Sequence, residues 1–196
     1  MLIRILPVLV LSSLLPFSVM AKQSCGFTKN NNQPLNDSDW RYATDPHGST
    51  ASIKKALLHE EQVWIAFSRV PRVDAKNNSW VELIYDLPNK TLAGQSGIML
   101  EYKSSTDLVV KLSQQDYGGE GDKSYAHYQY TLPAQTHWQT KCINLSDFSR
   151  PNWTPTSSVD KGIIKEHVDA VYLVPDLKDA MGGKAVVAVK NISIRP

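Results

Sequence analysis

The sequence has few cysteines, no excess of one charge and, after its first 21 residues, no long apolar run. Its 196 residues include two cysteines, 21 lysines and arginines, and 19 aspartates and glutamates. A near-neutral chain without a block of basic residues is not typical of proteins that bind nucleic acid or anionic membranes. Past residue 21 no apolar stretch reaches the roughly 18 residues that a membrane helix needs. We therefore predict no nucleic-acid partner and no stable membrane insertion.

The motifs of common catalytic and metal sites are missing from the sequence as well. The five histidines show no His-Glu-x-x-His or other paired metal-ligand spacing, and there is no Gly-x-Ser-x-Gly motif or phosphate-binding loop. Carboxylates on predicted strands, at Glu82, Asp86 and Glu101, would permit glycoside hydrolysis or lyase chemistry, but no separation of a pair is fixed. We predict that the protein is not an enzyme, and we keep a polysaccharide hydrolase or lyase as a third hypothesis.

Residues 1–21 are typical of an export signal. Arg4 supplies a short positive start, an apolar run follows, and Ala21 occupies a small-residue position before a predicted cleavage site ahead of Lys22. The run is short and contains two prolines, so we favour a cleaved signal peptide over a permanent membrane helix. The mature protein is therefore predicted to be secreted or periplasmic.

The two cysteines, Cys25 and Cys142, are predicted to form one disulfide, because an even pair in an oxidising compartment most simply pairs. In the chain-entropy model a bridge that closes so long a loop stabilises the fold by up to about 4–5 kcal/mol. The alternative is that Cys142 is a nucleophile. Its neighbours, Gln-Thr-Lys-Cys-Ile-Asn-Leu, are typical of a strand rather than of a nucleophile turn.

After Lys22 apolar and polar residues alternate with a period of two, and turn-forming residues interrupt the alternation at short intervals. This pattern predicts short β-strands. The segments that qualify are 62–70, 80–87, 97–104, 107–114, 124–132, 137–145, 168–174 and 185–194. Strands at this spacing, separated by Gly, Pro, Asn, Asp and Ser, predict an all-β fold in the form of a two-sheet antiparallel sandwich.

The chain divides into a signal peptide (1–21), an N-terminal extension (22–61) and a sandwich domain (62–196). Within the extension only residues 49–61 have helical spacing, with Ile53 and Leu57 four apart. The same segment is equally compatible with irregular structure that ends in a strand. The fold is therefore expected to contain at most one short helix.

Alternation also assigns side chains to faces, because successive side chains of a strand point to opposite sides of the sheet. If the strands 97–104, 107–114 and 124–132 are neighbours, their polar faces form one surface. Aromatic rings on such a surface would offer flat area to sugar rings, and amides and carboxylates would bond to sugar hydroxyls. The alternative is an ordinary solvated strand surface. The candidate ligand-binding residues on these strands are Glu101, Lys111, Gln115, Tyr125, His127 and Gln129.

The tryptophans divide into two groups. Trp64, Trp80 and Trp138 lie on predicted strands, and we expect them to pack in the core or at sheet edges. Trp153 lies in a loop flanked by prolines that restrict the backbone. It is a candidate stacking platform for a ligand, or else a plug over the core.

The segment Tyr-Gly-Gly-Glu-Gly-Asp-Lys (117–123) joins two of the alternating strands. Its glycines therefore predict a long hairpin with positive backbone dihedrals. The carboxylates Asp116, Glu120 and Asp122 could supply oxygen ligands to calcium, although their spacing does not match an EF-hand loop. We expect a hairpin first, with a calcium ion as the weaker alternative and no other cofactor.

The order of these segments resembles jelly-roll domains of the galactose-binding-like type. The likeness is greatest to family 11 carbohydrate-binding modules and the related complex I intermediate-associated protein 30 domain. It covers roughly residues 62–195 and depends most on "HWQTKCINLSDFSRPNW" (137–153), followed by "VDAVYLVP" and "AVVAVKNISI". The resemblance implies a β-sandwich whose concave face binds an extended polysaccharide such as a β-glucan, often with a structural calcium elsewhere. Of the residues that bind sugar in such modules, it carries over only to Tyr125 and His127.

Two functional hypotheses follow. The first is a secreted, non-catalytic carbohydrate-binding protein with a polysaccharide or glycan partner. The second is an exported effector or interaction protein that uses the same sandwich to bind a protein partner. A long concave aromatic groove would favour the first hypothesis, and a convex or loop-borne apolar patch would favour the second.

Overall fold

The computed structural model describes residues 34–74, 78–178 and 180–196. These residues form two antiparallel sheets of five strands each. Sheet A has the strand order β1 (Trp40–Thr44), β4 (Val81–Asp86), β9 (Val168–Pro175), β6 (Leu108–Gln114), β7 (Gln129–Leu132). Sheet B has the order β2 (Thr50–His59), β3 (Gln62–Arg69), β10 (Gly183–Arg195), β5 (Gly97–Ser104), β8 (Gln135–Asn144). The predicted all-β, two-sheet antiparallel sandwich is therefore confirmed.

Helical structure in the described residues is limited to short 3₁₀ segments. These are Asp37–Asp39, Pro88–Lys90, Gln115–Tyr117, Leu145–Asp147 and Lys165–His167. No helix in this part of the chain could cross a membrane. The predicted signal peptide and Cys25 lie outside the described residues, so the signal peptide and the Cys25–Cys142 disulfide stay predictions.

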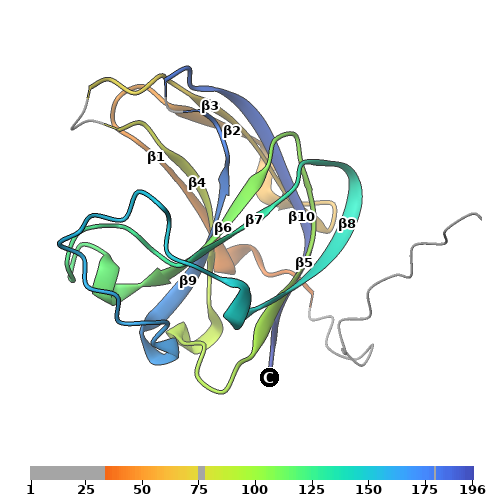
Figure 1. Cartoon of the computed structure of the whole chain (residues 1–196). Helices are drawn as coiled ribbons and strands as arrows, with labels where there is room; N and C mark the ends of the chain where they lie inside the picture. Colours follow the sequence, from red (N-terminus) through yellow and green to blue (C-terminus); the bar gives the residue numbers. More distant parts are fainter. Residues whose placement is uncertain (1–33, 75–77, 179) are drawn as a thin grey trace, which may run out of the picture.

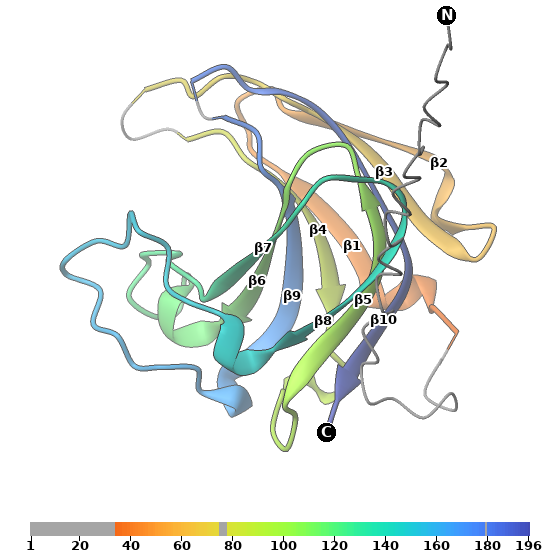
Figure 2. The same ribbon diagram turned by 45° about the vertical axis from the view of Figure 1, so that its right-hand side comes forward.

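The hydrophobic core lies between the two sheets and follows the alternation of the sequence. Figure 2 shows β2, β3, β10 and β5 to the right of the strands of sheet A. On β5 the even-numbered side chains Ile98, Leu100 and Tyr102 are buried, and on β6 Leu108 and Val110 are fully buried. The Tyr102 hydroxyl donates to the carbonyl of Pro133 at 2.8 Å, which satisfies this polar group. Burial of these apolar surfaces provides the main stabilisation of the sandwich.

The predicted boundary at residue 62 differs from the structure. β1 pairs with β4 in sheet A, and β2 pairs with β3 in sheet B, so the described part of segment 22–61 belongs to the sandwich. The helical alternative for residues 49–61 is wrong, because Thr50–His59 is a strand. Residues four apart share a face in a strand as well as in a helix. The spacing of Ile53 and Leu57 could therefore not distinguish the two structures.

β6 and β7 form the predicted hairpin, with Lys111 opposite Gln129 and Leu108 opposite Leu132. The strand predicted for 124–132 is shorter than expected, because only Gln129–Leu132 is a strand. Tyr125 has a backbone φ of 53°, which interrupts extended structure. The loop between β6 and β7 (115–128) and the long segment between β8 and β9 lie side by side at the left of Figures 1 and 2.

Candidate functional site

A groove runs over the outer face of sheet A. It consists of two adjoining cavities with volumes of about 730 Å³ and about 620 Å³. Both cavities are lined by Asn78, Trp80, Lys111 and Trp153, so they are two parts of one depression. The larger part lies beside the loop 115–128. The smaller part extends toward the opposite end of β6 and β9, where Val109 and Val174 line it.

Two tryptophans stand on the two sides of this groove. Trp80 immediately precedes β4, and Trp153 lies in the segment after β8, which meets the free edge of β7 through a bridge between Ser149 and Gln129. The strands β4 and β7 are three places apart in sheet A, a separation of about 14 Å. The exposed fractions are 38% for Trp80 and 54% for Trp153. Indole rings thus border the groove from both sides.

The exposure of Trp80 corrects the expectation that it packs in the core or at a sheet edge, and the exposure of Trp153 decides between a stacking platform and a plug over the core. Trp80 does not pack in the core or at a sheet edge, because Val81 and Leu83 take the inward positions and Trp80 therefore faces out. Trp153 is not a plug over the core. Trp64 and Trp138, which are half-buried, lie on sheet B beneath lysine side chains.

The floor of the groove contains a charge pair that spans β9. Glu82 on β4 and Lys111 on β6 are 3.7 Å apart, Oε1 to Nζ, with side-chain exposures of 17% and 19%. Burial raises the pKa of Glu82, while Lys111 and Arg41 act in the opposite direction. Between them Tyr172 accepts a hydrogen bond from Ser113 at 3.1 Å. The floor therefore offers a carboxyl, an ammonium and hydroxyl groups within a small area.

His127 forms part of the same floor. Its exposed fraction is 5%, and its Nδ1 accepts the backbone N–H of Gln114 at 3.2 Å. Burial, assisted by the positive charges of Lys111 and Arg150, lowers the pKa of His127 to about 4. The ring is therefore neutral near pH 7, and because Nδ1 accepts, the proton is on Nε2.

Asp169, which lines the larger part of the groove, has an acceptor without a donor. Oδ1 of Asp169 is buried and has no hydrogen-bond partner among the described residues. Asp169 belongs to the lining of the cavity that also contains Tyr172 and Lys111. Leaving a buried polar atom unpaired costs free energy. Asp169 therefore carries an unpaired acceptor directly beneath the surface of the groove.

The loop 115–128 forms one wall and presents Tyr125, which is 57% exposed. The loop is held internally by backbone bonds, including Asp122 N–H to the Asp116 carbonyl at 2.9 Å and Tyr125 N–H to the Tyr117 carbonyl at 2.7 Å. A Cβ added to Gly121 would overlap the carbonyl of Asp116. Glycine is therefore required at this close approach of two backbone segments.

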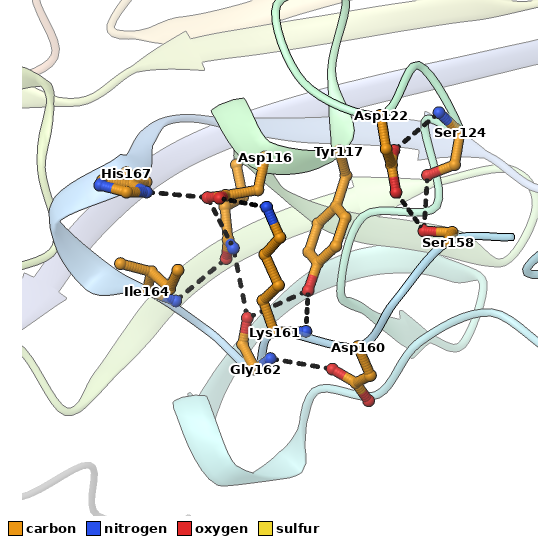
Figure 3. Close-up of polar contacts among 11 residues, drawn as sticks. Asp116, Tyr117, Asp122, Ser124, Ser158, Asp160, Lys161, Gly162, Ile164 and His167 are labelled. Carbon is orange, nitrogen blue, oxygen red and sulfur yellow. Dashed lines mark hydrogen bonds and ion pairs between the residues drawn. The ribbon is translucent and has the colours of Figure 1, made fainter.

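Figure 3 shows how the loop 115–128 is fastened to the segment 158–167. The Tyr117 hydroxyl accepts the backbone N–H of Lys161 at 2.9 Å and donates to the carbonyl of Gly162 at 3.3 Å. The Gln114 side-chain amide donates to the same carbonyl at 3.2 Å and accepts the N–H of Ile164 at 3.1 Å. Gln114 at the end of β6 and Tyr117 in the 3₁₀ segment that follows thus satisfy backbone groups of residues 161–164, which are neither strand nor helix.

Charged groups reinforce the connection in Figure 3. Asp116 pairs with His167 at 2.8 Å and with Lys161 at 3.3 Å, and these partners lower the pKa of Asp116. Ser158 donates to Asp122, which lowers the pKa of Asp122 to about 2. The segment that carries Trp153 therefore leaves β8, returns along the loop and is held there before it enters β9.

The three candidate calcium ligands are not gathered into one site. Asp116 and Asp122 are directed to separate partners, and Glu120 is exposed. Within the residues that the structure describes, no group of three His, Cys, Asp or Glu side chains could hold a metal ion. The carboxylates instead stabilise the two loops. A calcium site elsewhere stays a prediction.

The structure brings together six of the seven candidate ligand-binding residues. The groove is lined by Lys111, Gln115, Tyr125, His127, Gln129 and Trp153. Glu101 is not among them, because β5 belongs to sheet B and the chain crosses to sheet A before β6. The role of these residues in binding stays a prediction.

The sequence interpretation missed Trp80, Asp169 and Tyr172 as groove residues. The alternation of apolar and polar residues was the available signal for Trp80 and Tyr172. Their neighbours Val81, Val171 and Leu173 point into the core, so Trp80, just before β4, and Tyr172, on β9, must point outward. Asp169 had no such signal, because the register of β6 and β9 shifts beside it, between Ser113 and Gln114.

No family model matches the sequence, and no curated protein matches it. Among solved structures, the chain is similar to a family 11 carbohydrate-binding module from Clostridium thermocellum in complex with a β-1,3-1,4-mixed-linked tetrasaccharide. The TM-score is 0.58 at 18% identity, over 82% of this chain and 93% of that one. The family 11 module of the cellulosomal cellulase Lic26A-Cel5E of Clostridium thermocellum gives a TM-score of 0.56 at 18% identity, over 84% and 94%. The chain therefore has the jelly-roll fold of these carbohydrate-binding modules.

Proposed function

We propose that the protein binds a polysaccharide chain in the groove of sheet A and does not cleave it. The observation that carries the proposal is the position of Trp80 and Trp153 on opposite sides of a polar floor. The fold supports it, since a module with this fold has been solved with a bound tetrasaccharide. The predicted export signal would place the binding outside the cytoplasm.

The groove matches the two chemical features of a sugar ring. A pyranose presents apolar C–H faces, which pack on aromatic rings such as Trp80, Trp153 and Tyr125. It also presents hydroxyl groups at its edge, which bond to acceptors and donors such as Asp169 and the Nε2–H group of His127. A chain bound along the groove would place ring faces against the walls and hydroxyl groups on the floor.

The shape of the surface favours sugar over protein as the partner. Three of the four exposed aromatic side chains of the described residues, Trp80, Trp153 and Tyr125, line one depression rather than a convex patch, and Tyr42 is the exception. Its floor is charged and polar, with Glu82, Lys111 and others, whereas the centre of a protein interface is depleted of charged residues. We therefore place the protein-binding hypothesis second.

Hydrolysis or lyase chemistry has one observation in its favour. Glu82 in the groove has a raised pKa, which is a property of general acids in glycosidases. The ion pair between Glu82 and Lys111 accounts for a carboxylate at this position equally well, without any catalytic role. Release of reducing ends or unsaturated products from the glycan that is bound would establish catalysis in place of binding alone.

Affinity electrophoresis on a panel of soluble glycans, with pull-down on insoluble ones, tests the proposal. We expect retention by at least one neutral glycan, and loss of retention in Trp80→Ala and Trp153→Ala. Trp64→Ala is the matched control, because Trp64 lies on sheet B, away from the groove. A folded protein that no glycan retains, or retention that Trp64→Ala reduces as much as Trp153→Ala does, would contradict the proposal.

A further inference from the structure

The outer face of sheet B, opposite to the groove, carries a line of basic and aromatic side chains. Trp64 on β3 and Lys103 on β5 flank Ala188 of β10, which is the Cα partner of both. Lys54 on β2 lies over Trp64, with Nζ 5.7 Å from the ring centroid. Lys103 on β5 and Lys190 on β10 both lie over Trp138 on β8, at 4.6 Å and 5.8 Å. We call Lys54, Trp64, Lys103, Trp138 and Lys190 the lysine–tryptophan row.

The lysine–tryptophan row gathers three ammonium groups, and the indole rings that position them do not neutralise their charge. The face of an indole ring attracts an ammonium group and fixes its position, but the ring has no net charge. Two ammonium groups are thereby held at one ring, that of Trp138. None of the three lysines of the row has an ion pair with a described residue, and this includes Glu101, which faces the same side. An anionic partner would complete this arrangement.

The spacing of the charges points to a polymer rather than a small ion. Lys54 and the pair at Trp138 belong to opposite ends of the row, and β2 and β5 are three places apart in sheet B. Three strand spacings correspond to about 14 Å, which one sulfate or carboxylate group cannot span. An extended chain with repeated negative charges could contact both ends at once.

The aromatic rings of the row are less suited to nucleic acid. Single strands bind by stacking bases on open aromatic faces, whereas here lysines lie over both tryptophans. Nucleic-acid interfaces are also much more positively charged than this one, and the row contains no arginine. The net charge of the whole chain is near zero, but a net charge does not report how the charges are distributed over the surface, so it could not indicate the lysine–tryptophan row.

We propose that the lysine–tryptophan row binds a polyanionic polysaccharide, one that carries sulfate or carboxylate groups, at a second surface independent of the groove. The groove of sheet A and the row occupy the outer faces of different sheets, so both can be occupied together. The binding is electrostatic and weakens as the salt concentration rises.

Binding of the full chain to dextran sulfate, with uncharged dextran as the reference, tests the proposal. We expect Lys103→Gln/Lys190→Gln to weaken binding roughly tenfold or more at low salt, since each lysine near a dense anionic surface contributes substantially. Lys90→Gln/Lys178→Gln is the matched control, because it removes the same charge from exposed lysines that pair with Asp86 and Asp176. Trp138→Leu should also weaken binding, because the ring holds both ammonium groups.

Three outcomes would overturn the proposal. The first is an equal loss in both double variants, which would indicate attraction by net charge alone. The second is loss of binding in Trp153→Ala, which would place the polyanion in the groove of sheet A. The third is equally tight binding to single-stranded oligodeoxythymidine or to phosphatidylglycerol vesicles, which would change the class of partner. Retention of dextran sulfate binding by Trp153→Ala would separate this surface from the neutral-glycan site.

Discussion

The Tyr117 hydroxyl and the backbone N–H of Lys161 are joined by a hydrogen bond of 2.9 Å between two loops that are 44 residues apart in the sequence. Tyr117 is fully buried, and it belongs to the loop that presents Tyr125. Lys161 belongs to the segment that presents Trp153. This bond therefore couples two walls of the groove, and it explains how a long irregular segment can hold an exposed tryptophan in place.

Removal of this hydroxyl should affect both stability and binding. Tyr117→Phe leaves the partly buried Lys161 N–H without its acceptor, and we expect a loss of about 1 kcal/mol in the free energy of unfolding. Glycan affinity should fall as well, because the segment with Trp153 is less well held. Chemical unfolding and affinity electrophoresis measure the two effects. Tyr42→Phe, at an exposed position, is the control, and an unchanged stability of Tyr117→Phe would contradict the structural role.

Gly121 should tolerate no side chain. In Gly121→Ala the new Cβ overlaps the Asp116 carbonyl, so the backbone must shift and the loop bonds to Asp116 weaken. We expect a destabilisation of about 1–3 kcal/mol, in the range for steric overpacking, which thermal unfolding would detect. Gly119→Ala is the matched control, because its Cβ would meet only the Tyr125 hydroxyl at 3.5 Å. Equal effects of the two substitutions would show that the close approach at Gly121 is unimportant.

Asp169 should contribute to binding at the expense of stability. Because its Oδ1 has no donor in the free protein, Asp169→Asn should leave the free energy of unfolding unchanged or raise it slightly. The same substitution should lower glycan affinity, since an acceptor on the groove floor is altered. Asp86→Asn is the control: Asp86 is paired with Arg41 and Lys90, so its loss should cost stability and leave affinity unchanged. A clear destabilisation by Asp169→Asn would argue for a structural role instead.

His127 should make stability depend on pH. The pKa of His127 is about 4 in the fold, chiefly because of burial, against about 6.5 in an unfolded chain. As pH falls, the unfolded state binds the proton first, so this contribution is complete above about pH 6.5 and is lost down to about pH 4. The free energy of unfolding should fall by about 2 kcal/mol between about pH 7 and about pH 5 through this residue.

Urea unfolding at the two pH values measures this effect. His127→Gln, which can still accept the N–H of Gln114, should show a flatter pH dependence than the unsubstituted protein. His47→Gln makes the same substitution at an exposed position and is the matched control. If His127→Gln lost as much stability on acidification as the unsubstituted protein, the pH dependence would belong to other groups.

The sequence was most informative where a strand has one buried face. Alternation correctly placed Lys111 and Gln129 on one surface, because β6 and β7 form a hairpin and hairpin neighbours can be inferred from the chain order. Tyr125 and His127 line the same groove, but they do so from the loop 115–128, where strand alternation does not apply. Glu101 was placed on the wrong surface. Alternation shows which face of its strand a side chain occupies, but it does not show to which sheet the strand belongs. The change of sheets between β5 and β6 has no local signal in the short turn that connects them.

Long-range contacts explain the remaining differences. Thr50–His59 is a strand because β3 offers it a partner, and no property of that segment alone requires this. The path of the segment around Trp153 depends on single side chains such as Gln114 and Tyr117, which satisfy its backbone groups from another part of the chain. Such contacts cannot be recognised from alternation or turn composition.

The fastening of the loop 115–128 to the segment 158–167 implies that neither can detach alone. Opening either one breaks the shared bonds of Tyr117, Asp116 and Gln114, so the pair should open as one cooperative unit. In amide hydrogen exchange, the N–H groups of Lys161 and Ile164 should therefore have the same protection factor as that of Asp122, and all three protection factors should rise together when a glycan occupies the groove.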